Sequence, residues 1–506
     1  MRKSSTIVFG WVGIRLFLIL LGVVLGLLPL SGQDKMRFES SGDIGSPTLK
    51  GKWVFQAEGN KYLVTGGGVN MWGSRDAFYF VRSQVEGDLS MTAKVGFLGE
   101  GKNAHRKGGW MVRESLEPDS PYADAVVHGD GLISLQYRKV KGGETAEVQS
   151  PVRTPALLRF ERTGDVFTLS VSRNGASFLP VGSILLPLSS KAYAGLAVCS
   201  HEESILETAV FSDLSLNITK EVPMNKRVVE STLEIISIAS GERRIVYRAA
   251  DHFEAPNWTP DGKQLLINRK GRLYTIPVAG GELKQLETGK ATQCNNDHGI
   301  SFDGKWLAIS HSPAGKSLIY VLPATGGEPR LVTPLGPSYW HGWSPDGKTL
   351  TYCAERKGEY DIYAIPVEGG EEKRLTTAPG LDDGPEYSPD GEFIYFNSER
   401  TGAMRIWRMK PDGSGQEQVT IDEEYGDWFP HPSPDGKWLV FLSYDKSVKG
   451  HPPNQDVVLR ILPTAGGKPK ILARLFGGQG TVNVPSWSPD SKEFAFVSYR
   501  LVVPGI

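Results

Sequence analysis

One four-residue turn phrase recurs six times in the second half of the chain. Its common form is Ser-Pro-Asp-Gly, and its aspartates are Asp261, Asp303, Asp346, Asp390, Asp435 and Asp490. The intervals between them are 42, 43, 44, 45 and 55 residues. A period of about 40–45 residues is typical of β-propeller blades. Ser at the first position, Pro at the second and Gly at the fourth suit a type I turn between two strands. The repeat therefore constrains this half of the chain to a ring of β-sheets.

The number of strands around these turns predicts how the ring closes. Each turn lies between two short apolar stretches and is followed by a second hairpin, so a full unit supplies four strands. After the last turn only the stretch 493–499 remains, while the stretches 233–238 and 244–247 form a hairpin ahead of the first turn. Joining these segments completes a blade and removes the exposed edges of an open sheet. We predict a six-bladed propeller over residues 228–506, with an insertion around 446–455.

The first half of the chain has a different organisation. Residues 35–217 lack the repeat and alternate apolar and polar residues in strand-length runs, such as 77–81, 132–137 and 167–171. The composition of 59 Gly and 33 Pro beside 12 Trp, 17 Tyr and 20 Phe favours short strands joined by tight turns. We predict an all-β protein in which an N-terminal β-sandwich precedes the propeller and residues 218–227 form the linker.

The N-terminus predicts export. A basic start and an apolar run over 16–28, followed by small residues near Gly32, are typical of a secretory signal peptide, here residues 1–33. Thirteen apolar residues are too few to cross about 30 Å of hydrocarbon as a helix, so no stable membrane span is expected after cleavage near Gly32. The alternative is an uncleaved anchor, in which the stretch 7–13 joins the run across Arg15. We expect a periplasmic or secreted protein.

Charge, cysteine content and motifs exclude several classes. Lys and Arg number 56 and Asp and Glu 57, so the net charge of −1 lacks the basic footprint of a nucleic-acid-binding protein. Three cysteines are too few for a disulfide framework. The sequence contains no Gly-x-Ser-x-Gly elbow, phosphate loop or His-Glu-x-x-His zinc motif. Nucleophilic hydrolysis is therefore not indicated by any motif.

Polar residues gather at the start of the strand that enters each turn and at the end of the strand that leaves it. Because the turn joins the opposite ends of these two strands, both places lie on one face of the ring. Blade packing does not require polar side chains there. We therefore predict a ligand site on this face, and a merely solvated rim is the alternative.

Histidines precede three of the turns on this face. Neutral imidazoles from three blades around one axis are suited to hold a divalent metal ion, and a neighbouring carboxylate would complete the shell or act as a general base. The candidate metal ligands are His298, His341 and His431. The candidate catalytic residues are His298, His341, His431, Glu386 and Tyr444.

Further residues on the same face are candidates for binding the ligand itself. Arginines suit a uronate carboxylate or a sulfate, because a guanidinium group binds such anions through two parallel hydrogen bonds. The ligand-binding candidates are Asp297, His311, Arg356, Asp383, Arg400, His451, Asn483 and Arg500.

The turns themselves have a structural interpretation. An aspartate at this position bonds to its own turn backbone, on the face opposite to the predicted site. The tryptophans just before three of the turns, Trp258, Trp343 and Trp487, are assigned to the blade cores.

The repeats resemble the WD-like repeats of the TolB propeller family. The phrase is most complete at residues 343–348, Trp-Ser-Pro-Asp-Gly-Lys, and the likeness covers roughly residues 228–506. The resemblance implies a six-bladed propeller. It does not imply one function, because this fold hosts scaffolds, peptidase-associated propellers and lyases.

Residues 35–217 resemble the concanavalin-A-like jelly-roll domains of bacterial carbohydrate-active proteins. The likeness rests on the segments 43–45, 66–68, 76–78, 108–113 and 128–131. One interpretation is a glycan-binding groove or face in which exposed aromatic rings stack on sugars, with Trp72 or Tyr122 as the candidate ring. The other is structural, with the glycines at bulges and Trp110 in the core.

Three functions remain open from the sequence. The first is an exported carbohydrate-binding or carbohydrate-processing protein, whose jelly roll binds a glycan, acidic or neutral, and whose propeller binds an acidic sugar. Oligogalacturonate lyases have similar propeller repeats and a metal held by histidine, so this resemblance implies a metal-dependent lyase. The second is a TolB-like periplasmic scaffold that binds protein partners without catalysis. The third is a structural or adhesion module. The sequence leaves open whether the protein is an enzyme.

Overall fold

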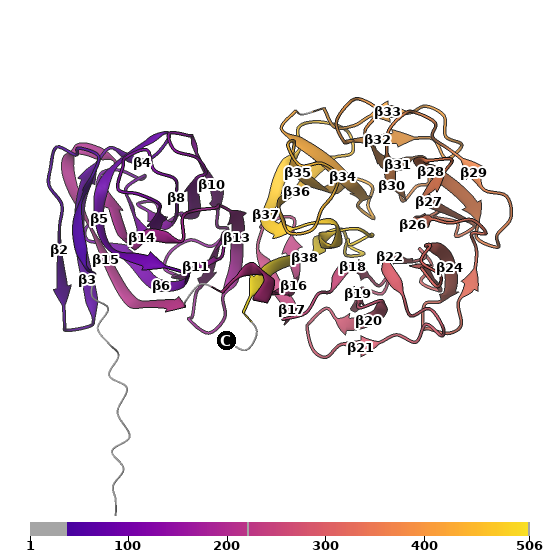
Figure 1. Cartoon of the computed structure of the whole chain (residues 1–506), viewed down its shortest axis with the longest axis horizontal. Helices are drawn as coiled ribbons and strands as arrows, with labels where there is room; N and C mark the ends of the chain where they lie inside the picture. Colours follow the sequence, from indigo (N-terminus) through magenta and orange to yellow (C-terminus); the bar gives the residue numbers. More distant parts are fainter. Residues whose placement is uncertain (1–37, 220–221, 422, 504–506) are drawn as a thin grey trace, which may run out of the picture. The chain divides into compact units, whose positions relative to one another are not determined.

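The computed structural model describes residues 38–219, 222–421 and 423–503 (Figure 1). The predicted signal peptide lies outside these residues. The described residues form strands and two short 3-10 helices, η1 (Met224–Lys226) and η2 (Gln479–Thr481), so the all-β prediction is confirmed for them. Within these same ranges, no helix has the length and apolar character needed to cross a membrane.

The first half of the chain forms two antiparallel sheets. One has the strand order β1-β5-β14-β7-β8-β9-β10, with β4 paired to β5, and the other has the order β13-β12-β11-β6-β15-β3-β2. The first sheet comprises β1 (Ser40–Ile44), β4 (Asn70–Trp72), β5 (Arg75–Glu86), β7 (Lys107–Arg113), β8 (Tyr122–His128), β9 (Ile133–Arg138), β10 (Thr145–Gln149) and β14 (Lys191–Cys199). The second comprises β2 (Lys52–Gln56), β3 (Lys61–Gly68), β6 (Asp88–Phe97), β11 (Leu157–Thr163), β12 (Val166–Ser172), β13 (Leu179–Leu185) and β15 (Glu202–Thr219).

These two sheets face each other. Strand β3 contacts β5 and β14, and β6 contacts β7. Burial alternates along β6 and β11, as expected for strands with one face on a core and the other in water. Strand β15 runs to Thr219, two residues into the predicted linker. The concanavalin-A-like assignment of this region stays a prediction.

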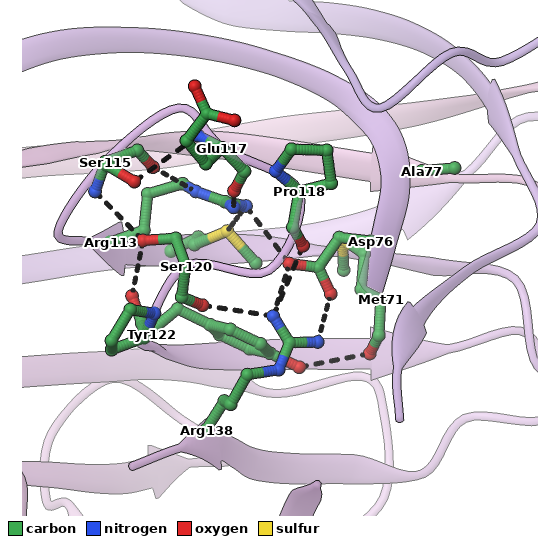
Figure 2. A network of polar contacts seen from close by, with 12 residues as sticks. Met71, Asp76, Ala77, Arg113, Ser115, Glu117, Pro118, Ser120, Tyr122 and Arg138 are labelled. Atoms are coloured by element: carbon green, nitrogen blue, oxygen red, sulfur yellow. Dashed lines mark hydrogen bonds and ion pairs between the residues drawn. The ribbon is translucent and has the colours of Figure 1, made fainter. Parts of the chain in front are cut away.

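Strands β7, β8 and β9 are buried on both faces. Figure 2 shows how the buried charged groups of one part of this sheet are paired, with the Asp76 carboxylate between Arg113 and Arg138. Asp76 Oδ1 is 2.7 Å from Arg138 Nη2, and Asp76 Oδ2 is 3.3 Å from Arg113 Nη1. Tyr122 is fully buried in this network and donates its hydroxyl to the carbonyl of Met71 at 3.2 Å. The prediction that Tyr122 is an exposed sugar platform is therefore wrong.

The second half of the chain forms six sheets around a common centre (Figure 1). Blade 1 contains β18 (Glu254–Trp258), β19 (Gln264–Arg269), β20 (Arg272–Pro277) and β21 (Lys284–Gln285). Blade 2 contains β22 (Cys294–Ile300), β23 (Trp306–His311), β24 (Leu318–Pro323) and β25 (Arg330–Leu331). Blade 3 contains β26 (Ser338–Trp343), β27 (Thr349–Arg356), β28 (Glu359–Pro366) and β29 (Lys373–Arg374). Blade 4 contains β30 (Asp382–Tyr387), β31 (Ile394–Ser398), β32 (Arg405–Met409) and β33 (Glu417–Gln418). Blade 5 contains β34 (Tyr425–Pro432), β35 (Trp438–Asp445), β36 (Gln455–Pro463) and β37 (Lys470–Gly477).

Blade 6 is built from both ends of the propeller segment, as predicted. Its order is β17-β16-β38, in which β16 (Val228–Ser237) pairs with β38 (Glu493–Val502) and with β17 (Arg243–Ala249). The expected innermost strand is reduced to one bridge between Trp487 and Phe494. Pro485 lies in this segment and has no N–H to donate to a ladder, which accounts for the short pairing.

The six turns share one hydrogen-bond pattern. The Ser or Thr hydroxyl donates to Oδ1 of the turn aspartate at 2.6–2.7 Å. The same oxygen accepts the backbone N–H two residues later at 3.0–3.2 Å. The structural interpretation of the turn aspartates agrees with these contacts.

Candidate functional site

The innermost strand of each of the first five blades carries a β-bulge at a corresponding position. The register shifts lie between Glu254 and Asn257, Cys294 and His298, Trp340 and Gly342, Asp383 and Glu386, and Trp428 and His431. A bulge re-aims the side chains around it. Neighbouring innermost strands contact one another around the central channel of the propeller. The bulges therefore bring polar side chains from several blades together along this channel.

Three polar pairings form this channel network. Asp297 accepts hydrogen bonds from the side-chain amides of Asn295 and Asn483, both at 2.5 Å. His341 Nε2 lies 3.2 Å from Asp383 Oδ1. His431 Nδ1 lies 2.7 Å from Glu386 Oε2. The structure thus brings together six of the predicted residues: Asp297, His341, Asp383, Glu386, His431 and Asn483.

Burial and pairing set the charges in this network. Burial raises the pKa of Asp297 to about 6, and it raises the pKa of Glu254, a neighbouring carboxyl on β18, to about 7. Burial opposes the charged form of both members of the His341 and Asp383 pair, but their mutual hydrogen bond raises the pKa of His341 and lowers that of Asp383. Burial also raises the pKa of Glu386, although His431 opposes the shift.

The three histidines are not equivalent. His298 and His341 precede their turn aspartates by five residues, whereas His431 precedes its own by four. Successive side chains of a strand point to opposite faces, so this one-residue offset gives His431 a different partner. The His298 imidazole is fully buried, which lowers its pKa to about 4 and keeps it neutral. Across the described ranges, no three His, Cys, Asp or Glu side chains are placed to hold one metal ion, so these imidazoles do not fit a shared metal.

The predicted arginines are occupied by internal carboxylates. Arg356 Nε lies 2.7 Å from Glu372 Oε1. Arg400 Nη2 lies 2.9 Å from Asp382 Oδ2. Arg500 Nε lies 2.5 Å from Glu230 Oε1. None of these three is therefore presented as an unpaired cation for an acidic sugar.

The remaining predicted residues have contacts other than the three pairings of the channel network. His311 Nδ1 accepts the backbone N–H of Gln293 at 3.3 Å. Tyr444 is fully buried and donates its hydroxyl to the Pro452 carbonyl at 3.2 Å. The His451 ring packs edge-on against Trp428, with 4.6 Å between ring centroids.

A cavity of about 430 Å³ opens at the other end of the ring, on the face of the turns. Its wall takes one residue from each blade, the residue three positions before the turn aspartate: Trp258, Ile300, Trp343, Tyr387, Pro432 and Trp487. Its rim takes the residue just before that aspartate in five blades: Pro260, Phe302, Pro389, Pro434 and Pro489. We call this site the turn-face cavity.

The tryptophans of this cavity have two roles. They are largely buried, as the blade-core interpretation expects. The indole N–H of Trp343 donates to the Gly299 carbonyl and that of Trp487 to the His431 carbonyl, both at 2.9 Å. These bonds fix the rings in the wall and leave their carbon surfaces to the cavity. The interpretation of these tryptophans as core alone was therefore incomplete.

Glu386 joins the channel network to the turn-face cavity. Among the described residues that line the cavity it is the one carboxylate, and none of them is Lys, Arg or His. The sequence signal that could have located this site is the aromatic residue recurring three positions before the turn aspartate, which is Trp in three blades and Tyr in a fourth.

The comparisons with known proteins agree with this fold. The family described as the TolB beta propeller domain matches residues 341–460. An uncharacterised protein of Agrobacterium fabrum is 54% identical over 273 residues, which make up 54% of this chain and 93% of that protein. The chain belongs to the TolB-like β-propeller family. A solved structure of a protein from Agrobacterium tumefaciens, provisionally named TolB, is 54% identical, covers 54% of this chain and 99% of its own, and has a TM-score of 0.53.

A more distant likeness concerns the lyases named above. The oligogalacturonate lyase of Vibrio parahaemolyticus is 15% identical, with coverage of 55% of this chain and 99% of its own and a TM-score of 0.35. A likeness at this level carries no functional argument for the TolB-like propeller.

Proposed function

We propose that this TolB-like protein is an exported scaffold, without catalysis, that binds an extended segment of a partner protein in the turn-face cavity. The observation that carries the proposal is the wall itself, to which all six blades contribute a residue and four contribute an aromatic one. An aromatic wall with a rim of prolines offers a rigid apolar surface, which a ligand can contact at low entropic cost.

The contacts within the channel network favour a binding protein over an enzyme. The groups predicted to act as acid, base or metal ligand are buried and mostly paired with one another, as His341 is with Asp383. A metal-dependent lyase would need a set of three ligands, and its arginines would need to be open to a uronate. Periplasmic or secreted location remains part of the proposal, as the sequence of the N-terminus suggests.

Glycan binding is the second candidate, and one observation favours it. Trp72 of β4 keeps 36% of its surface exposed, and Lys107 Nζ lies 5.3 Å from the centroid of its ring. An exposed aromatic ring suits stacking on a sugar. This site would act separately from the turn-face cavity.

The test compares two exposed aromatic residues of blade 2. Phe302 is 48% exposed on the cavity rim, and Trp306 is 46% exposed outside the cavity lining. A random peptide array and a glycan array are probed with the wild type, Phe302→Ala and Trp306→Ala. Peptides that bind the wild type and Trp306→Ala but lose about tenfold in affinity with Phe302→Ala support the proposal. Binding of glycans alone, or of peptides without any effect of Phe302→Ala, would overturn it.

A further inference from the structure

We propose that the turn-face cavity selects a cationic group, the ammonium or guanidinium of a Lys or Arg in the bound segment, and seats it against Glu386 between the wall tryptophans. This inference rests on the proposed function, because it names the chemistry of the residue that enters the same cavity.

The charge of the lining is the first argument. In the part of the lining that the described residues form, Glu386 is the one carboxylate and no side chain is basic. Oppositely charged groups in a site with low-dielectric walls attract more strongly than they do in water. The cavity therefore favours a cation over a neutral group of equal size, and it disfavours an anion.

The hydrogen bonds of Glu386 leave room for such a partner. Its Oε2 is bound to His431 Nδ1 at 2.7 Å, and the side chain keeps 12% of its surface exposed. No other hydrogen bond to this carboxylate is found in the described part of the chain. Oε1 is therefore available to accept a bond from a ligand that enters from the turn face.

The protonation of His431 decides the net charge of this pair. Its Nε2 is buried and has no hydrogen-bond partner among the described residues. An imidazolium would place a second N–H there without an acceptor, which is costly. A neutral imidazole that donates from Nδ1 fits the contacts, so Glu386 contributes the charge of the pair. Burial raises the pKa of Glu386, and a bound cation would offset that cost.

Two neighbouring polar side chains of the lining are already used. Asn257 accepts the Ile300 N–H at 3.1 Å and donates to the Pro485 carbonyl at 2.6 Å. The Ser301 hydroxyl donates to Asp303 at 2.7 Å. A neutral sugar would find few free partners here, whereas a cation gains from the aromatic faces as well as from the carboxylate.

The test uses two small probes that differ in one charge, Nα-acetyl-lysine amide and Nα-acetyl-norleucine amide. Their binding is measured by tryptophan fluorescence on the wild type, on Glu386→Gln and on a control, Glu282→Gln, in which an exposed carboxylate is removed. We expect the lysine probe to bind the wild type and the control about tenfold more tightly than the norleucine probe, and Glu386→Gln to abolish that preference. Equal binding of the two probes to the wild type would overturn the inference.

The outcomes separate this inference from the function beneath it. If the peptides whose binding depends on Phe302 lack Lys and Arg, the scaffold function is supported and the cation site is overturned. If no peptide depends on Phe302, the scaffold fails as well. If Glu386→Gln does not fold, the salt dependence of binding to the wild type provides the test. Raising the salt concentration from about 0.05 to about 0.5 M should reduce the preference for the lysine probe over the norleucine probe several-fold. A preference that does not change with salt would contradict the role of the carboxylate.

Discussion

The two ends of the propeller channel differ in a way that their residue types alone conceal. One end is rich in His, Asp and Asn, yet most of those side chains are buried and paired with one another, as Asp297 is with Asn295 and Asn483. The turn face is lined mainly by Trp, Tyr, Phe and Pro, yet it holds the cavity. Buried polar groups must find partners inside the protein, so a cluster of them marks an internal network as readily as a ligand site.

The largest effect should come from breaking a pair in the channel network. Asp383→Ala leaves His341 without its carboxylate in a buried position, which should lower the free energy of unfolding by about 3 to 5 kcal/mol. Binding of the lysine probe to the folded fraction should not change. Urea unfolding measures the free energy of unfolding, and a fluorescence titration measures the affinity for the lysine probe. A loss of probe affinity at unchanged stability would make this end the ligand site.

The next effect depends on pH and concerns Glu254. Its pKa in the folded protein is raised by burial to about 7, so between about pH 4.5 and pH 7 the folded state holds a proton that the unfolded state has lost. Stability therefore falls as the pH rises through this window. Glu254→Gln should match the wild type at pH 4 and exceed it by roughly 3 kcal/mol at pH 8.

Thermal unfolding across this pH range tests the Glu254 prediction, with Glu282→Gln as the exposed control. An equal gain at both pH values would show that Glu254 is not the titrating group.

A smaller effect should separate the two roles of a wall tryptophan. Trp343→Phe keeps an aromatic ring in the cavity but removes the N–H that donates to the Gly299 carbonyl. We expect a loss of about 1 to 2 kcal/mol in the free energy of unfolding. The affinity for the lysine probe should fall only a few-fold, because the cation still contacts an aromatic face. Complete loss of binding would mean that the indole itself is required.

The smallest effect should come from a turn that lies outside the cavity lining. Gly347 has φ +70°, and a Cβ there would meet no atom within 4 Å. Gly347→Ala should therefore cost about 1 kcal/mol through backbone conformation alone and leave probe binding unchanged. A larger cost in a denaturant titration would point to contacts that this turn does not show.

The sequence predicted the ring better than it predicted the site. Six turns at a regular spacing and a spare hairpin ahead of the first turn were enough to predict six blades and their closure by β16 and β38. The bulges of the inner strands have no such signature, and they decide which side chains meet. The one-residue offset of His431 from His298 and His341 is visible in the sequence, but its consequence depends on those bulges.

The residue types also did not predict which side chains are buried. Tyr122 was expected on a surface and lies under the network of Asp76, Arg113 and Arg138. Trp343 and Trp487 were expected in the core and also line a cavity. An aromatic residue fits a core and an interface for the same reason, and only the packing of neighbouring blades decides between them.

The indole N–H signals of the tryptophans offer the most direct measurement of where the ligand binds. We expect the lysine probe to shift the signals of Trp343 and Trp487 in an NMR titration of the wild type, because both rings line the turn-face cavity. The signal of Trp428, which packs against His451 at the other end of the channel, should not move. A shift confined to Trp428, or to Trp72, would contradict the assignment of the turn face as the binding site.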